Sequence, residues 1–235
     1  MFFFGIYLNI LVVFLGGSIA LLVFSKIRRL REIRERSYSK GLDYFLLTFG
    51  ILWISVAIRN LFFVLRYPEW DRWFWAWVTG PLTYFHILPL FFFFGWAFFK
   101  DRRGLNLAFK GFFSLAIILA VAFLFLFGFE TVATEWGTKH DANPYTDAVF
   151  TFAVYLPILI LVICFLVQRF MIWGKTHALF DRQMFGFAIG FLVYALIAVL
   201  DGLALVVGYG LILVRIAGTL LPSLIFYYYV TEEMK

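Results

Sequence analysis

The chain has 235 residues, of which 64% are hydrophobic and only 14% charged, and its mean hydropathy is +0.93. Soluble domains are nearer half apolar and a quarter charged, so this composition excludes a water-soluble globular protein. The net charge of +6 does not indicate nucleic-acid binding either, because the basic residues lie in short blocks between apolar runs.

The apolar residues fall into runs of about 20, the length that a helix needs to cross the hydrocarbon core of a bilayer. We therefore predict an all-α, polytopic membrane protein with a single transmembrane domain over 1–235, built as a bundle of seven transmembrane helices. The first run lacks a basic leader and a cleavage site, so we expect a retained helix. In chain order, the predicted spans are 2–24, 44–65, 73–99, 109–129, 147–169, 184–207 and 210–230.

The distribution of basic residues predicts the direction of the spans. The segments 25–43, 100–110 and 169–183, together with the C-terminal tail, hold 15 lysines and arginines, whereas the opposite loops hold three. Lysine and arginine concentrate in cytoplasmic loops, so the N-terminus is predicted outside and the C-terminus in the cytoplasm. The longest of the predicted outer loops covers 130–146 and is mildly acidic.

Three charged residues stand out inside the predicted spans: Arg59, Asp201 and Arg215. At 1.5 Å per residue, all three are predicted ~7–10 Å beneath the outer surface. Charges at this depth are costly in lipid and are expected to face protein or a water-filled cavity. Asp201 and Arg215 lie on adjacent helices, and a salt bridge between them would form a structural clasp. Arg59, with Asn60 as its natural neighbour, would then either share Asp201 or face an anionic ligand.

The third span is interrupted near its middle by prolines. Pro81 and Pro89 each remove a backbone donor and bend a helix, and His86 lies between them. A bent helix could place Thr83, Tyr84 and His86 along a small polar pocket. The alternative is a buried histidine that is hydrogen-bonded to a freed carbonyl or to a tyrosine hydroxyl.

The residue inventory argues against a cofactor and against catalysis. The predicted spans hold one histidine, His86, so a haem with two histidine ligands would lack the second. Every lysine lies in a loop or at a span end, which excludes a retinal Schiff base. No set of histidines and carboxylates suits a metal, and no nucleophile–base arrangement suggests an intramembrane protease. We therefore expect no cofactor, no metal and no enzymatic activity.

Two further features have ordinary structural interpretations. The small residues Gly16, Gly17, Gly186 and Gly190 allow helices to approach closely, and we expect them to pack inside the bundle. The chain also holds 33 phenylalanines, four of them consecutive at 91–94. These are interpreted as bulk that faces the lipid.

Several features follow one another along the chain in a recognisable order. A basic first loop leads to a second span with a central tryptophan, and a proline in the third span precedes an aromatic run and a basic turn. A basic–glutamine pair opens the sixth span, which carries an acidic residue near its outer end, and the seventh span holds a proline. The residues concerned are Trp53, Pro89, the run 90–99, the turn 100–103, Arg182, Gln183, Asp201 and Pro222.

This order resembles the seven-helix N-terminal sensor region of bacterial membrane histidine kinases. The resemblance implies a multi-pass protein of the plasma (inner) membrane of a bacterium, with a role in signal transduction. The sequence departs from that family in one respect: there the last helix leads into cytoplasmic signalling domains, whereas this sequence stops at Lys235. Any signal is therefore expected to pass through a separate protein, unless the module has been recruited for another role.

These features are compatible with three classes of function, of which two are favoured. The first is a sensor-like module that binds a small or lipidic ligand near the outer leaflet and acts on another membrane or cytoplasmic protein, or within a homo-oligomer. The alternative is a structural or accessory subunit of a larger membrane complex. A small-molecule transporter comes third, because matched broken helices and inverted repeats are not evident. Membrane lipids are expected partners in each case. The candidate ligand site comprises Arg59, Asn60, Tyr84, His86, Asp201 and Arg215.

Overall fold

The computed structural model describes residues 2–34, 40–99, 101–134, 137–176, 179–202 and 210–231. This part of the chain is mostly helical, and seven of its helical segments are long and apolar enough to cross a membrane. The prediction of a multi-pass helical membrane protein is therefore confirmed. The side of the membrane on which each end lies is treated below as a proposal.

Four spans are single helices, and three are interrupted by a π-helical turn. The single helices are α1 (Phe2–Arg34), α2 (Lys40–Val64), α6 (Arg103–Phe127) and α9 (Leu179–Gly202). The third span comprises α3 (Pro68–Phe74), the π-turn η1 (Trp75–Thr79), α4 (Gly80–Phe85) and α5 (Leu88–Phe99). The fifth and seventh comprise α7 (Pro144–Phe150), η2 (Thr151–Tyr155) and α8 (Leu156–Thr176), then α10 (Gly210–Arg215), η3 (Ile216–Leu220) and α11 (Leu221–Thr231).

Several helices extend beyond the predicted spans, because hydropathy follows the membrane and not the helix. α1 runs to Arg34, ten residues past the predicted edge, through a polar segment without glycine or proline. The third span begins at Pro68, where proline occupies the first turn as helices prefer. The fifth begins at Pro144, and the side chain of Asn143 caps it by accepting from the backbone N–H of Thr146.

The predicted loop over 130–146 contains a β-hairpin, so the all-α prediction is wrong in this segment. β1 (Phe129–Thr134) pairs antiparallel with β2 (Gly137–Ala142), with Thr131 opposite His140. β-Branched residues in β1 favour a strand. Gly128 (φ 73°) precedes the hairpin and Gly137 (φ 117°) opens β2, and both adopt backbone conformations that favour glycine.

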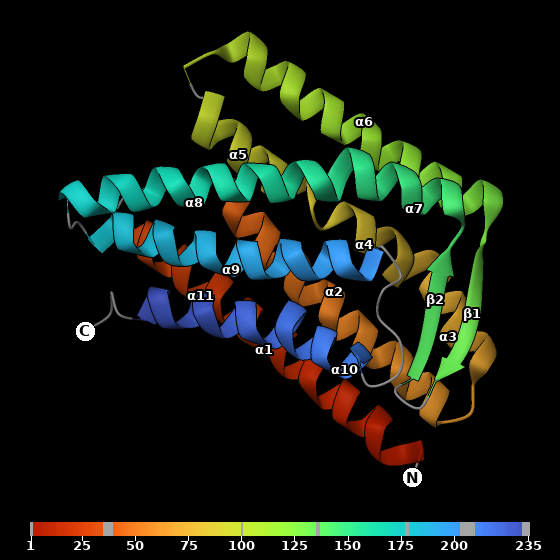
Figure 1. The fold of residues 1–235 in the computed structure, drawn as a ribbon. Coiled ribbons are helices and arrows are strands. Elements are labelled where there is room, and N and C mark those ends of the chain that lie inside the picture. The colour runs from red at the N-terminus through yellow and green to blue at the C-terminus, as the bar shows by residue number, and fades with distance from the viewer. Residues whose placement is uncertain are drawn as a thin grey trace.

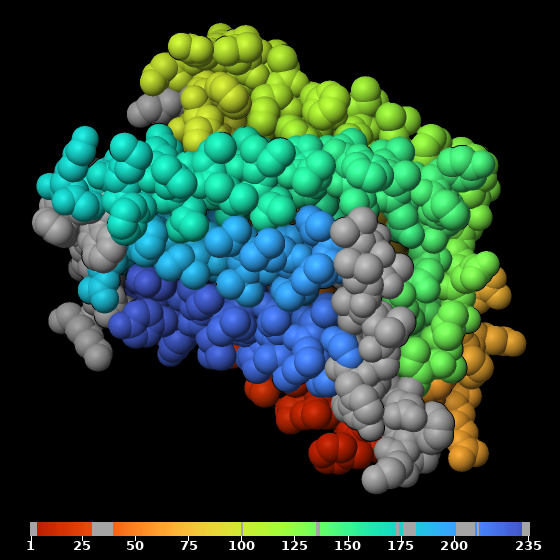
Figure 2. Space-filling model, in the orientation of Figure 1, coloured from red at the N-terminus to blue at the C-terminus, as the bar shows by residue number. Residues whose placement is uncertain are grey.

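The hairpin lies at one end of the bundle, together with the N-terminus, α3 and α10, as Figure 1 shows. We call this the hairpin end and the opposite end, where the described chain finishes, the C-terminal end. Helices α8, α9 and α11 lie side by side on the face drawn in Figure 2. Close approach between helices occurs at glycine, as expected: Gly17 of α1 faces the backbone of Gly50 in α2.

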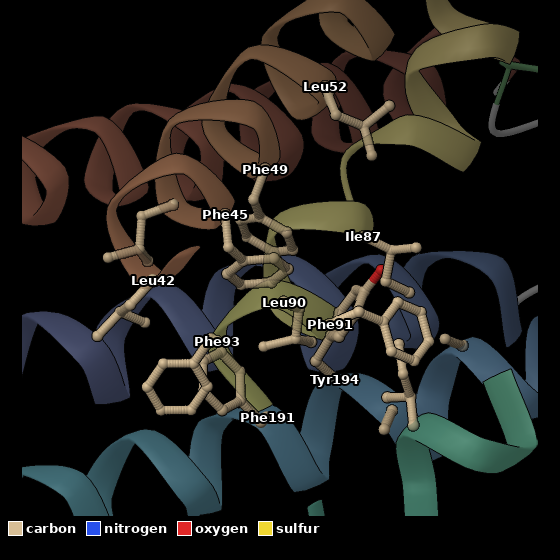
Figure 3. Close-up of a cluster of buried hydrophobic side chains, with 14 of the residues drawn as sticks. Leu42, Phe45, Phe49, Leu52, Ile87, Leu90, Phe91, Phe93, Phe191 and Tyr194 are labelled. Atoms are coloured by element: carbon tan, nitrogen blue, oxygen red, sulfur yellow. The ribbon is translucent and has the colours of Figure 1, made fainter. Parts of the chain in front are cut away.

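The half of the bundle toward the C-terminal end is filled by aromatic rings, which we call the aromatic core. Each of these phenylalanines is at most 1% exposed, and their rings pack mainly edge-on or tilted at centroid distances of about 5–6 Å. Figure 3 shows several of them converging from α2, α5 and α9. The aromatic core comprises Phe45, Phe49, Phe93, Phe94, Phe165, Phe187, Phe191 and Phe226.

The lipid-facing interpretation of the run at 91–94 is thus wrong for most of its members. Phe91, Phe93 and Phe94 are at most 1% exposed, and Phe92 alone of the four is exposed to a substantial degree, at 38%. Phe91 stacks on Phe113 of α6 at a centroid distance of 3.7 Å. Three of four consecutive helix positions can be buried when neighbouring helices cover most of the circumference, as they do for α5.

Candidate functional site

A cavity of about 350 Å³ lies between the hairpin and the middle of the bundle. Its walls come from α2, the third span, β2, α7, η2, α9, α10 and η3. Lys139 and Asp141 line its mouth, and their side chains are 25% and 45% exposed, so the cavity reaches the surface at the hairpin end. Its volume falls within the range of small-molecule sites.

The irregular parts of the helices meet at this cavity. The three π-turns each contribute one lining residue: Trp75 from η1, Tyr155 from η2 and Gly218 from η3. His86, at the break between α4 and α5, also lines it. π-Turns weaken regular helix geometry and occur frequently at functional sites. Their convergence from three separate spans marks this cavity as the candidate site.

Four of the six predicted site residues line the cavity: Arg59, Tyr84, His86 and Arg215. Asn60 does not, although it is only 1% exposed. It packs instead beneath the hairpin, where a Cβ at Gly137 would collide with its amide oxygen. The side chain of Asp201 lies outside the described residues, so its pairing with Arg215 stays a prediction.

Arg59 is 3% exposed and is held by the hairpin end of the protein. Its Nε lies 3.5 Å from Oδ1 of Asp71, and its Nη2 donates a hydrogen bond of 2.9 Å to the carbonyl of Thr138 in β2. Asp71 itself is 1% exposed. The predicted spans leave Asp71 in the loop between the second and third spans, and Arg59 was expected to share Asp201 or meet a ligand. Asp71 is an acidic partner of Arg59 that this expectation did not include.

Asp71 was missed because the third span was predicted to begin at 73. The helix begins at Pro68, which places Asp71 in its first turn and turns the side chain toward α2. A signal was present in the sequence: a proline followed within three residues by two acids, Glu69 and Asp71, is typical of a helix N-terminus.

His140 joins Asp71 to the hairpin. Its Nε2 lies 3.4 Å from Oδ2 of Asp71, its Nδ1 lies 2.8 Å from the hydroxyl of Thr131, and its ring stacks on Trp75 at 5.0 Å between centroids. Burial lowers the pKa of His140, while the hydrogen bond to Asp71 opposes that shift. The neutral imidazole therefore accepts from Thr131 at Nδ1 and carries its proton at Nε2, a tautomer assigned from these partners.

The prediction of an outer loop over 130–146 placed His140 in that loop, outside the candidate site. Its burial follows from the two-residue period of a strand, which sends Thr138 and His140 into the protein and Lys139 and Asp141 toward solvent. Lys139 and Asp141 then pair with each other at 2.8 Å on the outside.

Both arginines of the cavity lie over tryptophan rings. The Arg59 guanidinium carbon is 5.3 Å from the Trp75 ring centroid, and that of Arg215 is 5.0 Å from the Trp53 ring centroid. Such cation–π contacts stabilise a desolvated positive charge without neutralising it. Among the described lining residues, Nη1 of Arg59, the indole nitrogens of Trp53 and Trp75 and the hydroxyl of Thr138 are buried without a hydrogen-bond partner.

His86 forms the floor of the cavity. Its Nδ1 lies 3.2 Å from the carbonyl of Leu82, and its Nε2 is hydrogen-bonded to the hydroxyl of Tyr194 in α9. The tyrosine hydroxyl is one of the partners expected for this histidine, whereas the Leu82 carbonyl is not a freed one, because it also accepts from the backbone N–H of His86. Directly beyond it, the rings of Phe45 and Phe49 lie 6.3 Å from the imidazole, so the aromatic core closes the cavity on this side.

Within the described residues, no group of three or more histidine, cysteine, aspartate or glutamate side chains is placed to hold a metal ion. Comparison with known proteins finds no match: no family model, no curated protein and no solved structure is similar to this chain.

Proposed function

We propose that this protein is a non-catalytic, sensor-like membrane module that binds a small or lipidic ligand in the hairpin-end cavity and acts on another protein. One observation carries the proposal: a cavity that opens at the hairpin end is lined by residues with buried, unpartnered polar atoms and ends on a closed aromatic floor. Unpartnered buried donors are costly, and a ligand that accepts their hydrogen bonds would remove that cost.

The closed floor favours a receptor over a transporter. A transporter needs a route that opens to the second side, whereas the rings of the aromatic core fill the space between His86 and the C-terminal end. Opening such a route would require several fully buried phenylalanines to leave their partners together. A receptor needs only a change in helix packing.

The seventh span offers a path for that change. Arg215 and Gly218 line the cavity, and the same span continues through α11, which packs against α1 and α9, to Thr231 at the C-terminal end. Phe226 and Ser223 on this helix are completely buried. A ligand that shifts η3 would therefore move residues at the far end of the bundle. The resemblance to kinase sensor regions supports the same direction of signalling.

We propose that the hairpin end faces outward and the C-terminal end lies in the cytoplasm, because basic residues concentrate toward the latter. Ala133 in β1 and Arg102 in the turn before α6 are both exposed, at opposite ends. Ala133→Cys should react with an impermeant maleimide in whole cells, and Arg102→Cys should react only after lysis. The reverse pattern would overturn the orientation.

The cavity itself is tested by filling it. Ala198 of α9 is 8% exposed and lines the cavity, whereas Ala108 lies on the exposed face of α6. Protein purified gently from membranes should retain a small molecule or lipid, detected by native mass spectrometry. Ala198→Leu should lose it and the control Ala108→Leu should keep it. Equal retention by both variants would contradict ligand binding at this cavity.

An accessory subunit of a larger complex is the second candidate. It is favoured by exposed tryptophans on α3 and η1, since Trp70, Trp73 and Trp77 are each more than half exposed. Blue-native electrophoresis of mildly solubilised membranes separates the two functions. A large co-migrating assembly that persists in Ala198→Leu supports the subunit, and a small oligomer supports the receptor.

A further inference from the structure

Several residues that line the cavity carry buried polar atoms without a hydrogen-bond partner, and each of these atoms can donate a hydrogen bond. The unpartnered atoms are Nη1 of Arg59, the indole N–H groups of Trp53 and Trp75 and the Thr138 hydroxyl. Indole and guanidinium nitrogens cannot accept hydrogen bonds. A ligand that satisfies these atoms must therefore present acceptor oxygens.

The charges around the cavity sharpen this requirement. Asp71 meets Arg59 only at Nε, at 3.5 Å, and is shared with His140. Arg215 lies near enough to Arg59 for the two positive charges to repel each other. Of the carboxylates on the lining, Asp141 pairs with Lys139, and Asp147 interacts electrostatically with Tyr84. The Arg59 side is the place for an anion.

The lining also has an aliphatic part. Leu52 and Val56 of α2, Ile197 and Ala198 of α9 and Val214 of α10 line the cavity, and these side chains contain no polar atom. A site that combines donors with aliphatic groups matches an amphipathic molecule, because each part of the ligand then leaves water for a suitable surface.

We propose that the cavity binds an amphipathic anion, with a carboxylate or phosphate headgroup at Arg59, Trp53, Trp75 and Thr138 and an aliphatic body against Leu52, Val56 and Val214. This inference rests on the proposed function and names its ligand class. A fatty-acid-like molecule and an anionic lipid headgroup share the chemistry.

The test measures binding to the full chain in nanodiscs of neutral phosphatidylcholine, with decanoate, decyl phosphate, decanol and decyltrimethylammonium as probes. Decanoate or decyl phosphate should bind at least about tenfold more tightly than decanol, since a hydrogen bond to a charged group contributes ~1.5–3 kcal/mol. The cation should bind most weakly. Nanodiscs that contain phosphatidylglycerol identify the source: competition with decanoate indicates a lipid headgroup, and no competition indicates a soluble anion.

Conservative variants locate the headgroup. Trp53→Phe and Trp75→Phe keep an aromatic ring but remove the N–H, so each should weaken decanoate binding several-fold and leave decanol binding unchanged. Arg59→Lys keeps the charge but removes the planar fork, with a similar loss. Trp77→Phe is the matched control, because Trp77 is 62% exposed and packs on Phe125 away from the cavity.

Two results would overturn the inference: decanol or the cation binding as tightly as the anions, or no binding of either anion. If decanol binds tightly and Ala198→Leu abolishes that binding, the cavity binds ligands but does not select anions; the proposed ligand class is then wrong and the proposed function stands. If Ala198→Leu retains the native ligand, the proposed function itself is contradicted.

Discussion

The two halves of the bundle are built from the same helices but are packed differently. α2 passes through both: Phe45 and Phe49 near its start are fully buried among other rings, whereas Trp53 and Arg59 farther along line a cavity. In the aromatic half, the large side chains are fully buried against one another. The hairpin half leaves space and unpartnered donors. Groups that lower stability persist where function needs them, so the difference agrees with the proposal that the hairpin half binds a ligand.

The largest loss of stability is expected from a substitution in the aromatic core. Phe191→Ala should destabilise the protein by roughly 3–5 kcal/mol, because Phe191 is fully buried between Phe45, Phe94 and Phe226 and the bundle can collapse only in part around the space left. The measurement is unfolding in mixed micelles with increasing dodecyl sulfate. Phe152→Ala, at a side chain that is 68% exposed, is the control and should change stability little.

A smaller loss is expected from the ion pair of the hairpin half. Asp71→Asn leaves the buried Arg59 without its acid; breaking a buried pair costs ~3–5 kcal/mol in soluble proteins, and polar pairs in bilayers have measured nearer ~1 kcal/mol. We expect about 2 kcal/mol, between these values.

A double-mutant cycle with Arg59→Gln should show coupling between Arg59 and Asp71. The parallel cycle of Asp201→Asn with Arg215→Gln tests the predicted clasp. Coupling of Arg59 to Asp201, with none to Asp71, would mean that Asp201 and not Asp71 stabilises the Arg59 side chain.

One matched pair of substitutions tests the packing difference directly. Ala188 and Ala198 lie ten residues apart on α9, the first in the aromatic half and the second on the cavity wall. Ala188→Leu should cost ~1–3 kcal/mol, because a close-packed site has no room for a larger side chain. Ala198→Leu should cost less than about 1 kcal/mol, since it grows into existing space. Equal losses in the same micelle assay would abolish the distinction between the halves.

The smallest effect is a pH dependence that arises from His140. Burial lowers its pKa, so below about pH 6.5 the unfolded chain binds a proton that the folded protein resists. The stability contributed by neutral His140 is therefore present above that pH and is lost as the pH falls. Asp71 opposes the shift, and Arg59 and Arg72 reinforce it.

Thermal unfolding of the purified protein should show a melting temperature that declines from about pH 7.5 to about pH 5, and His140→Gln should flatten this decline. Thr131→Val, which removes the hydroxyl beside Nδ1 but keeps the histidine, should retain it. An identical decline in His140→Gln would assign the effect to other groups.

Much of the fold could be predicted because a chain that crosses lipid must form long apolar helices, and the sequence contains seven apolar runs of that length. The irregularities were harder to predict. Each π-turn ends two residues before a proline, at Pro81, Pro157 and Pro222, so the prolines mark these places, whereas the phase changes themselves leave no trace in hydropathy. The burial of Phe91, Phe93 and Phe94 was missed because apolar residues look alike whether they face lipid or protein.

The candidate site was half predictable. Arg59, Arg215, Tyr84 and His86 were recognised because polar groups are conspicuous within apolar spans. Depth brought Arg59 and Arg215 together, and the prolines of the third span drew attention to Tyr84 and His86. His140 was missed because a loop assignment hides the alternation of a strand, and Asp71 because the predicted span began too late. A rule that looks for a proline and acids at a helix start, and for period two in long loops, would have found both.

The aromatic core has an electrical consequence. A potential across a membrane falls mainly through its dry, poorly polarisable part, and in this protein the dry part is the phenylalanine-filled half. Carrying one elementary charge through the whole of a 100 mV potential is worth ~2.3 kcal/mol. Because the cavity opens at the hairpin end, water that filled it would hold the Arg59 side of the cavity close to the potential of the adjacent solution, and only a small fraction of that energy would act there. An ion held there would bind almost equally well to energised and de-energised cells, unlike the gating charges of a voltage sensor.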